Sequence, residues 1–212
     1  MLDSVIEFLG KGGFMMYPLL LSSIIGLSIT IEKMITLKRS KVIVPEIVSV
    51  LENIKNYDDI ELAKSICNQH KGSFANIIQV GLNNKDLPKE EIKEVLNDSG
   101  RQEVYSLEKG LGILETIAGI APLMGLLGTV IGILKVFDVI QTKGMGHANM
   151  MAGGISEALI TTIIGLAIGI PALIVYNYFT NKAEGLILTI EKYSSGMLRK
   201  LTYFKENRDN AV

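Results

Sequence analysis

The sequence predicts an all-α integral membrane protein with three transmembrane helices and with long helices that extend into the cytoplasm. Three runs of 18 or 19 residues contain no charged side chain and no histidine, at 14–31, 116–134 and 158–176. At about 1.5 Å of helix rise per residue, each run covers the roughly 30 Å hydrocarbon core of a bilayer. Hydrophobic residues make up 48% of the 212 residues, and their concentration in these runs disfavours a soluble domain.

Charge and cysteine content exclude several other classes of protein. The 21 basic and 22 acidic residues nearly balance, so the chain has no excess positive charge with which to bind nucleic acid. Cys67 is the single cysteine, which excludes a disulfide framework within one chain. The sequence contains no phosphate-binding glycine loop, no nucleophile elbow and no Cys/His spacing of a metal site. We therefore predict no catalytic residue, no metal ligand, no resident cofactor and no enzyme activity.

The basic residues predict on which side of the membrane each end of a span lies. Lys33, Lys38, Arg39 and Lys41 follow the first run closely, whereas Lys11 alone precedes it. Cytoplasmic flanks carry the excess of Lys and Arg, so the N-terminus is predicted outside and the C-terminus inside. The loop from about Asp138 to Gly154 carries one Lys, Lys143, and six basic residues follow the third run. These counts predict the same orientation.

The predicted elements follow one another in a simple order. They are an outside segment at 1–13, a first span at 14–31, a cytoplasmic helical region at 32–110, a second span at 111–137, an outside loop at 138–153, a third span at 154–180 and a cytoplasmic C-terminal helix at 181–212. The first span is predicted to be retained, because no small-residue cleavage site of a signal peptide follows it.

Start signals predict the helices of the cytoplasmic region. Asp58, with Glu61 three residues later, predicts the start of one helix. A second helix is predicted from Pro88, and its apolar positions recur at helical spacing with no further proline before Pro122. One continuous helix is therefore expected from the cytoplasm through the second span. A short helix is expected after Pro45, and the third span is expected to continue as an amphipathic tail helix.

Small residues and prolines on the second and third spans predict close helix packing. Gly128 with Gly132, and Gly165 with Gly169, are small-xxx-small pairs that let another helix approach closely. Each proline removes a backbone N–H donor and leaves one carbonyl of its helix unpaired. In a membrane such a carbonyl is tolerated only where protein, water or a neighbouring hydroxyl group can contact it. Packing within one chain and packing around a pore are both open. The residues assigned to packing are Gly125, Gly128, Gly132, Gly165, Gly169, Pro122 and Pro171.

Five polar side chains on these spans are the candidate pore residues: Glu115, Thr129, Glu157, Thr161 and Thr162. At about 100° per residue, Glu115 and Thr129 point within about 40° of each other, and Glu157 shares a face with Thr161. A carboxylate at membrane depth indicates a functional site, although Glu157 could instead cap the start of the third helix. Each threonine could likewise bond only its own helix. No aspartate or histidine lies in the three runs, so this chain alone cannot form a relay of titratable groups.

Two long motifs resemble the MotA/TolQ/ExbB family. They are APLMGLLGTVIG at 121–132 and GISEALITTIIGLAIGIPALIVYN at 154–177. The opening GGFMMYPLLLSS at 12–23, with IEK at 31–33, is similar to the shorter ExbB-type members. The resemblance covers nearly the whole chain in order. Three spans with one modest cytoplasmic insertion favour the ExbB/TolQ branch over flagellar stators of the MotA type.

This resemblance implies a homopentamer in the bacterial inner membrane, whose second and third spans line a central pore and whose outside segments face the periplasm. A dimer of single-span partners, ExbD-like or TolR-like, would occupy the pore and supply the aspartate that this chain lacks. Proton flow would then drive a motion that a TonB-like or TolA-like protein passes to the outer membrane. Thr129 and Thr162 are implied to be pore hydroxyls facing that aspartate, and Glu157 the acidic residue at the head of the third span.

Several alternatives stay open. The adjacent hydroxyls of Thr161 and Thr162 suit either a proton path or a partly dehydrated Na⁺, so the transported ion is H⁺ or Na⁺. Glu115 is assigned to the cytoplasmic mouth without a matching motif. The family pattern does not separate TonB-linked uptake from Tol-linked envelope maintenance, and a non-conducting membrane scaffold is a further alternative. A solute transporter is disfavoured because the chain lacks inverted repeats.

Overall fold

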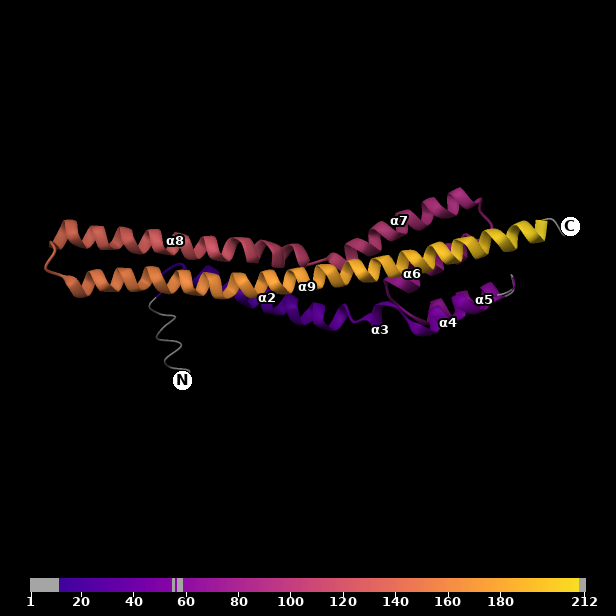
Figure 1. Cartoon of the computed structure of the whole chain (residues 1–212), viewed down its shortest axis with the longest axis horizontal. Coiled ribbons are helices and arrows are strands. Elements are labelled where there is room, and N and C mark those ends of the chain that lie inside the picture. The colour runs from indigo at the N-terminus through magenta and orange to yellow at the C-terminus, as the bar shows by residue number, and fades with distance from the viewer. Residues whose placement is uncertain (1–11, 55, 57–58, 210–212) are drawn as a thin grey trace. The chain divides into compact units, whose positions relative to one another are not determined.

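The computed structural model describes residues 12–54, 56 and 59–209, and within these ranges all regular structure is α-helical (Figure 1). The helices are α2 (Met16–Thr36), α3 (Arg39–Val42), α4 (Pro45–Asn53), α5 (Asp59–Gln69), α6 (Ser73–Asn83), α7 (Lys89–Glu108), α8 (Leu111–Lys143) and α9 (Ala148–Asp209). Among these described helices, α2, α8 and α9 are long and apolar enough to cross a membrane. The predicted all-α fold with three spans is thus confirmed, whereas the orientation in the membrane stays a prediction.

The chain divides into two compact units. The first contains residues up to Glu32 together with Gly110–Tyr178, and the second contains Lys33–Lys109 together with Phe179 and the residues after it. Both α2 and α9 contribute residues to each unit. The first unit holds the three uncharged runs, and the second holds the segments predicted to be cytoplasmic.

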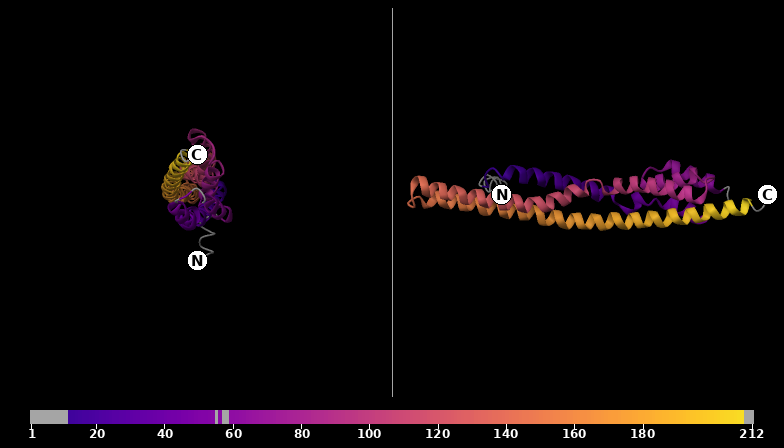
Figure 2. Two further views of the ribbon diagram at one scale, coloured as in Figure 1. Left: turned by 90° about the vertical axis from the view of Figure 1, so that its right-hand side faces the viewer. Right: turned by 90° about the horizontal axis from the view of Figure 1, so that it is seen from above.

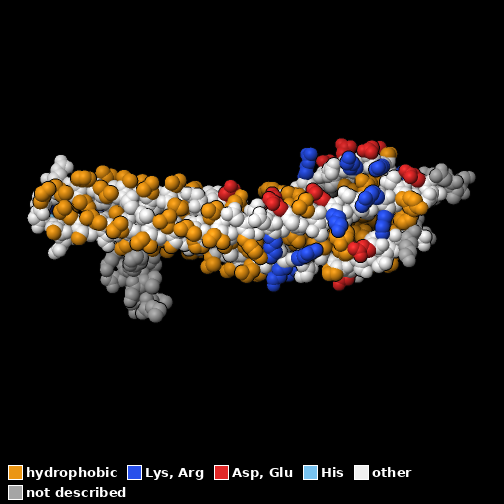
Figure 3. Space-filling view, in the orientation of Figure 1, with side chains coloured by type: hydrophobic (Ala, Val, Ile, Leu, Met, Phe, Trp, Pro, Cys, Tyr) orange, Lys and Arg blue, Asp and Glu red, His pale blue; other side chains and the backbone are white. Residues whose placement is uncertain are grey.

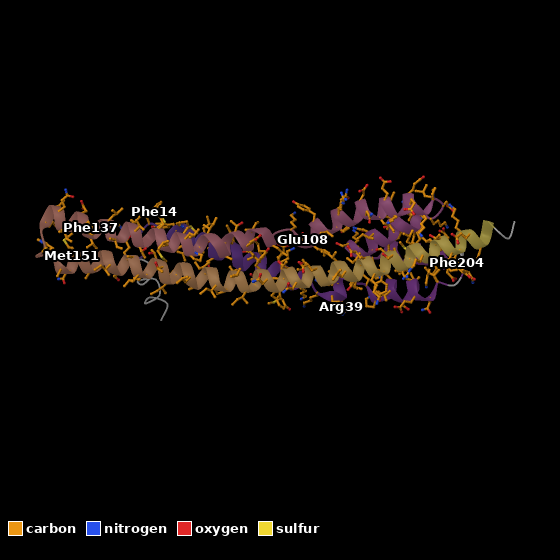
Figure 4. All side chains as sticks on the ribbon, turned by 45° about the horizontal axis from the view of Figure 1, so that its top comes forward. Phe14, Arg39, Glu108, Phe137, Met151 and Phe204 are labelled. Carbon is orange, nitrogen blue, oxygen red and sulfur yellow. The ribbon has the colours of Figure 1, made fainter. Side chains whose placement is uncertain are left out.

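In the first unit, α8 and α9 form an antiparallel hairpin against which α2 packs. The two helices lie side by side (Figure 1, Figure 2) and are joined by residues 144–147, where Gly144 has a φ of 78°. Figure 4 labels Phe137 of α8 and Met151 of α9 on either side of this connection. Leu19 of α2 is fully buried in a cluster with Ile117 and Ala121 of α8.

The remaining surface of the first unit is apolar. Large side chains such as Leu123, Leu134 and Ile174 are more than 60% exposed. On the face seen in Figure 3, hydrophobic side chains are spread along this unit and few charged side chains are visible. A helix that is apolar on nearly all sides is typical of a membrane span, because lipid tails solvate its outer face.

In the second unit, helices α4 to α7 pack on one another in sequence, and α4 and α6 contact the C-terminal part of α9. The predicted amphipathic tail is confirmed, because its buried side chains lie at helical spacing: Ala183, Leu186, Ile190, Met197 and Leu201. Phe74 of α6 meets Tyr193 of α9 edge to face, with 5.6 Å between ring centroids. Cys67 of α5 is also buried, and desolvation raises the pKa of its thiol to about 11.

Two lysines of α9 link the elements of this unit by hydrogen bonds to backbone carbonyl oxygens. Lys200 donates from Nζ to the carbonyl oxygens of Leu51 and Glu52, at 2.7 and 2.8 Å, near the C-terminus of α4. Lys205 donates to the carbonyl oxygens of Asp86 and Leu87 in the turn before α7, at 2.8 and 3.1 Å. Cations are favoured at helix C-termini, where the last carbonyls lack a helical donor.

The expected continuous helix from the cytoplasm through the second span is wrong. Helix α7 ends at Glu108 and α8 begins at Leu111, with Gly110 in the left-handed conformation at a φ of 89°. Lys33, which is 2% exposed, donates from Nζ to the Leu107 carbonyl at 3.1 Å. A glycine that adopts a positive φ and a buried cation at the last turn together favour a helix end at this point.

Two further helix expectations have different outcomes, and one helix was not expected. The predicted helix start at Asp58 lies outside the described residues, and α5 begins at Asp59 with Glu61 in its first turn. Helix α4 begins at Pro45, as expected for a proline in the first turn. Helix α6 is not among the predicted elements. Its apolar face is broad, and Phe74, Ile77, Ile78 and Leu82 are all buried.

We predict that Gly110→Ala destabilises the protein, because an L-residue in the left-handed region costs about 1–2 kcal/mol. The matched control is Gly112→Ala in the first turn of α8. Around Gly112 no heavy atom lies within 4 Å of an added Cβ, and alanine is the better helix former. Thermal unfolding of the purified protein in detergent should therefore show a lower midpoint for Gly110→Ala only. An unchanged midpoint for Gly110→Ala would contradict the assigned helix break.

Candidate functional site

The glycines assigned to packing lie along the contact between α8 and α9. A Cβ placed on Gly125 would be 2.9 Å from the Thr161 carbonyl oxygen, and one on Gly132 would be 2.7 Å from the Ala158 Cβ. From the other helix, a Cβ on Gly165 would be 2.6 Å from the Ala121 carbonyl oxygen. Real Cβ atoms do not approach so closely, so these positions require glycine and the two helices touch backbone to backbone.

Gly128, Gly169 and Pro122 belong to the same contact between the two helices. The Thr161 side chain occupies the space that a Cβ on Gly128 would need, with Cγ2 at 3.0 Å from that position. A Cβ on Gly169 would be 2.6 Å from Cγ of Pro122. Pro122 also leaves the Ala118 carbonyl without its helical donor, and that oxygen faces Gly169 across the contact. We call the contact from Pro122 to Gly132 on α8 and from Gly154 to Gly169 on α9 the glycine seam.

Pro171 follows Gly169 by two residues of α9, so it points to another side of the helix, and it is exposed. Gly154 was not among the residues predicted from the sequence, although a Cβ on it would be 3.0 Å from the Gly132 carbonyl oxygen. The second small-xxx-small pair of α9, Gly154 with Ala158, is the signal that predicts this contact.

The two adjacent threonines of α9 sit differently in the glycine seam. Thr161 is 1% exposed, and its Oγ1 donates to the carbonyl oxygens of Ala158 at 2.9 Å and Glu157 at 3.1 Å on its own helix. Thr162 is half-buried, and its Oγ1 donates across the seam to the Gly125 carbonyl oxygen at 3.1 Å. A hydroxyl that donates in this way still has lone pairs that accept a hydrogen bond. Thr162 therefore joins the two helices and keeps an acceptor.

Thr129 and Glu115 lie apart from these threonines. Thr129 is half-buried beside Gly128, and its Oγ1 donates to the Leu126 carbonyl oxygen of its own helix at 2.6 Å. Glu115 is exposed near the start of α8. The fourteen-residue separation of Glu115 and Thr129 corresponds to roughly 21 Å along a helix, so Glu115 is not part of the same cluster. The structure thus brings together Glu157, Thr161 and Thr162, with Thr129 at the edge of the seam.

Glu157 forms an ion pair with Lys135 of α8. The Lys135 Nζ lies 2.6 Å from Oε1 and 2.8 Å from Oε2 of Glu157. The Glu157 side chain is 16% exposed, whereas that of Lys135 is 52% exposed. Gly13, with a φ of 66°, packs directly on the Glu157 carboxylate and leaves no room for a Cβ. The carboxylate is therefore enclosed by the ammonium group on one side and the chain before α2 on the other.

The position of Glu157 excludes a capping role for it, and its ion pair adds Lys135 to the candidate site. Glu157 does not cap the start of the third helix, because α9 begins at Ala148 and Glu157 lies inside it. Lys135 is not among the candidate residues predicted from the sequence. The available signal is positional: Lys135 ends the uncharged run 116–134, and Glu157 immediately precedes the run 158–176. In an antiparallel hairpin, these two positions fall at the same end and carry opposite charges.

Comparison with known proteins places the chain in one family. Residues 69–192, more than half of the chain, match the profile of the MotA/TolQ/ExbB proton channel family. The chain belongs to the MotA/TolQ/ExbB proton channel family. The matched region contains the whole of α8 and the glycine seam with Lys135, Glu157, Thr161 and Thr162. The resemblance seen in the sequence motifs is confirmed.

Individual relatives of the MotA/TolQ/ExbB family place the chain with its ExbB-type members. A putative biopolymer transport protein ExbB homolog from Methanothermobacter thermautotrophicus is 32% identical over 210 residues, which cover 95% of this chain and 72% of the relative. A putative ExbB-like protein from Synechocystis is 33% identical over 175 residues, 80% of this chain and 68% of the relative. The Tol-Pal system protein TolQ of Pseudomonas aeruginosa is 43% identical over 86 residues, 41% of this chain and 37% of the relative.

We predict that the Lys135–Glu157 pair stabilises the hairpin through charge complementarity. Lys135→Glu places two carboxylates side by side and should lower the thermal midpoint of the purified protein. The double variant Lys135→Glu/Glu157→Lys should recover most of the loss, with a coupling free energy of about 1 kcal/mol, because Lys135 is half exposed.

The matched control for this cycle is Lys143→Glu, which makes the same change of charge at the end of α8 without a carboxylate partner among the described residues. It should leave the midpoint nearly unchanged. If the double variant is no more stable than Lys135→Glu alone, the ion pair does not hold the two helices together.

Proposed function

We propose that the chain is the pore-forming subunit of an ion-driven motor in the bacterial inner membrane. In this proposal it is ExbB-like and couples proton flow to TonB-dependent energised transport across the outer membrane. Its membership of a proton channel family and its long match to ExbB-named relatives support this role. The observation that carries the proposal is Thr162, a hydroxyl within an uncharged span that bonds across the glycine seam and retains an acceptor.

The proposal requires neighbours, because one α8–α9 hairpin cannot enclose a pore. A homopentamer would surround the path with copies of α8 and α9, in line with their exposed surfaces. The chain offers threonine hydroxyls inside its spans and a carboxylate already paired with Lys135 at one end. A titratable group at the level of the threonines would therefore come from a single-span ExbD-like or TolR-like partner that carries an aspartate. A TonB-like or TolA-like protein would receive the motion.

The roles of the candidate residues follow from their positions. Thr162, with Thr129 at the edge of the seam, would present hydroxyls to the partner's aspartate. Thr161 is buried and bonds only its own helix, so it would position the seam rather than line the path. Glu157 with Lys135 would form the outer mouth, and Glu115 the cytoplasmic mouth. Hydroxyls relay protons through water and also coordinate Na⁺, so we propose H⁺ as the ion on the family's description alone.

A Tol-linked role in envelope maintenance is the second candidate. The 43% identity to the TolQ protein of Pseudomonas aeruginosa supports it, although that match spans 41% of this chain. The two roles share the same pore chemistry and differ in the partner that receives the motion. Co-purification with a TonB-like or a TolA-like protein separates them.

We predict that Thr162→Val strongly reduces ion conduction while the complex still assembles. Valine keeps the shape of threonine and removes the hydroxyl, so proteoliposomes containing this variant and the aspartate-bearing partner should lose at least about tenfold in proton flux if relay through the hydroxyl contributes as general acid–base groups do. Flux is measured with an internal pH-sensitive dye after a potential is imposed. Repeating the assay with a Na⁺ gradient identifies the ion.

The matched control is Thr116→Val. The Thr116 hydroxyl is exposed and donates only to the Gly112 carbonyl oxygen of its own helix, at 2.7 Å. This variant should conduct like the parent protein. Full flux through Thr162→Val would overturn the assignment of Thr162, and the absence of flux through the parent complex would favour the non-conducting scaffold.

A further inference from the structure

Three basic residues gather where the chain leaves the predicted membrane spans. Lys38 and Arg39 follow the end of α2 at Thr36, and Lys182 follows the third uncharged run, which ends at Tyr176, on the continuous helix α9. At about 1.5 Å of rise per helical residue, Lys182 lies roughly 9 Å along α9 from the end of that run. If the spans cross a bilayer as predicted, all three cations lie near the depth of the lipid headgroups.

These cations line one hollow within the second unit. The hollow has a volume of about 830 Å³, which is within the range of ligand-binding pockets. Arg39, labelled in Figure 4, projects from the short helix α3, and Ser49 and Glu52 come from α4. Tyr193 of α9 also lines the hollow, and its ring is held by the edge-to-face contact with Phe74. The walls thus come from α3, α4 and α9.

Positive charge predominates among the side chains that line the hollow. Glu52 is the carboxylate that faces it, against the three cations. Lys38 and Arg39 are exposed, and within the described residues neither makes an ion pair with a carboxylate. The Lys182 ammonium group lies 6.0 Å from the centroid of the Phe179 ring. A cluster of cations beside hydroxyl donors is the arrangement that binds a phosphate group.

We propose that this hollow binds the headgroup of an anionic phospholipid, with Lys38, Arg39 and Lys182 around its phosphate. A lipid fits better than a soluble anion because Lys38, Arg39 and Lys182 follow the ends of two predicted spans closely along the chain. The wall of the hollow also includes apolar side chains, Ile43, Pro45 and Val48, that suit the glycerol and ester region of a lipid. Basic pockets at the cytoplasmic ends of membrane helices bind anionic headgroups in this way. The site is separate from the glycine seam and does not depend on ion conduction.

Native mass spectrometry of the detergent-purified protein tests this site. The protein is titrated with phosphatidylglycerol, with zwitterionic phosphatidylethanolamine as the lipid control and inorganic phosphate as the soluble control. The triple variant Lys38→Gln/Arg39→Gln/Lys182→Gln should bind phosphatidylglycerol on the order of a hundredfold more weakly, since each cation near an anionic headgroup contributes roughly fivefold. Phosphatidylethanolamine should bind weakly to both proteins, and phosphate should not compete at equal concentration.

The matched control is Lys89→Gln/Lys93→Gln/Lys192→Gln. It removes the same charge from exposed positions that do not line the hollow, and it should bind phosphatidylglycerol like the parent protein. Equal loss in the two triple variants would overturn the site in favour of a general charge effect. Competition by an acidic peptide without selective binding of phosphatidylglycerol would also overturn it, and would indicate an acidic protein partner instead.

Glu52→Gln gives a second test that does not depend on losing function. It removes the one carboxylate of the hollow, so phosphatidylglycerol should bind several-fold more tightly than to the parent protein. The Lys200 contacts use the Glu52 backbone carbonyl and are kept in this variant. Unchanged or weaker binding by Glu52→Gln would contradict the proposed place of the headgroup.

Discussion

The close backbone contact between α8 and α9 is the constraint on which the rest of the first unit depends. In a bilayer, helices gain little from burying apolar surface, so they associate where small residues let their backbones approach. The glycine seam provides this approach at Gly125, Gly128, Gly132 and Gly165, where a methyl group would collide with the other helix. The seam fixes which residue of α8 lies opposite which residue of α9. It therefore also fixes how Thr162 lies relative to Gly125 and Lys135 relative to Glu157.

The polar contacts of the hairpin follow from this fixed pairing. Thr162 reaches the Gly125 carbonyl only because no side chain stands between them, and Lys135 reaches Glu157 because both lie at the same end of the antiparallel pair. Buried polar groups in a membrane must find partners within the protein. In the seam, the Thr161 hydroxyl finds its hydrogen-bond acceptor on its own helix, and the Thr162 hydroxyl joins the two helices. At one end of the seam, the Glu157 carboxylate is paired with Lys135. In the second unit, lysines serve a comparable purpose, since Lys33 and Lys200 donate to carbonyls at helix ends.

The sequence predicts the spans, the helical class and the packing glycines because these depend on local composition and on simple periodicity. The length of an uncharged run matches the thickness of the bilayer core, and small-xxx-small spacing indicates where two helices touch. Other features depend on tertiary partners. The end of α7 needs the positive φ of Gly110 and the Lys33 ammonium group, which is distant in sequence, so a periodic pattern alone continues the helix. The Lys135–Glu157 pair likewise exists only after the hairpin has formed. Helix α6 is amphipathic, but it has no side-chain cap at Gly72 and no acidic residue in its first turn, so no start signal marks it in the sequence.

The central claim is that the glycine seam sets the position of the threonines, and a size exchange at Gly128 and Thr161 tests it most directly. Gly128→Ala inserts a methyl group into the space of the Thr161 side chain, and overpacking of this kind costs about 1–3 kcal/mol. The thermal midpoint of Gly128→Ala should therefore fall clearly, and Gly128→Ala/Thr161→Gly, which moves the small residue to the other helix, should recover part of the loss. A Gly128→Ala protein as stable as the parent would contradict the claim.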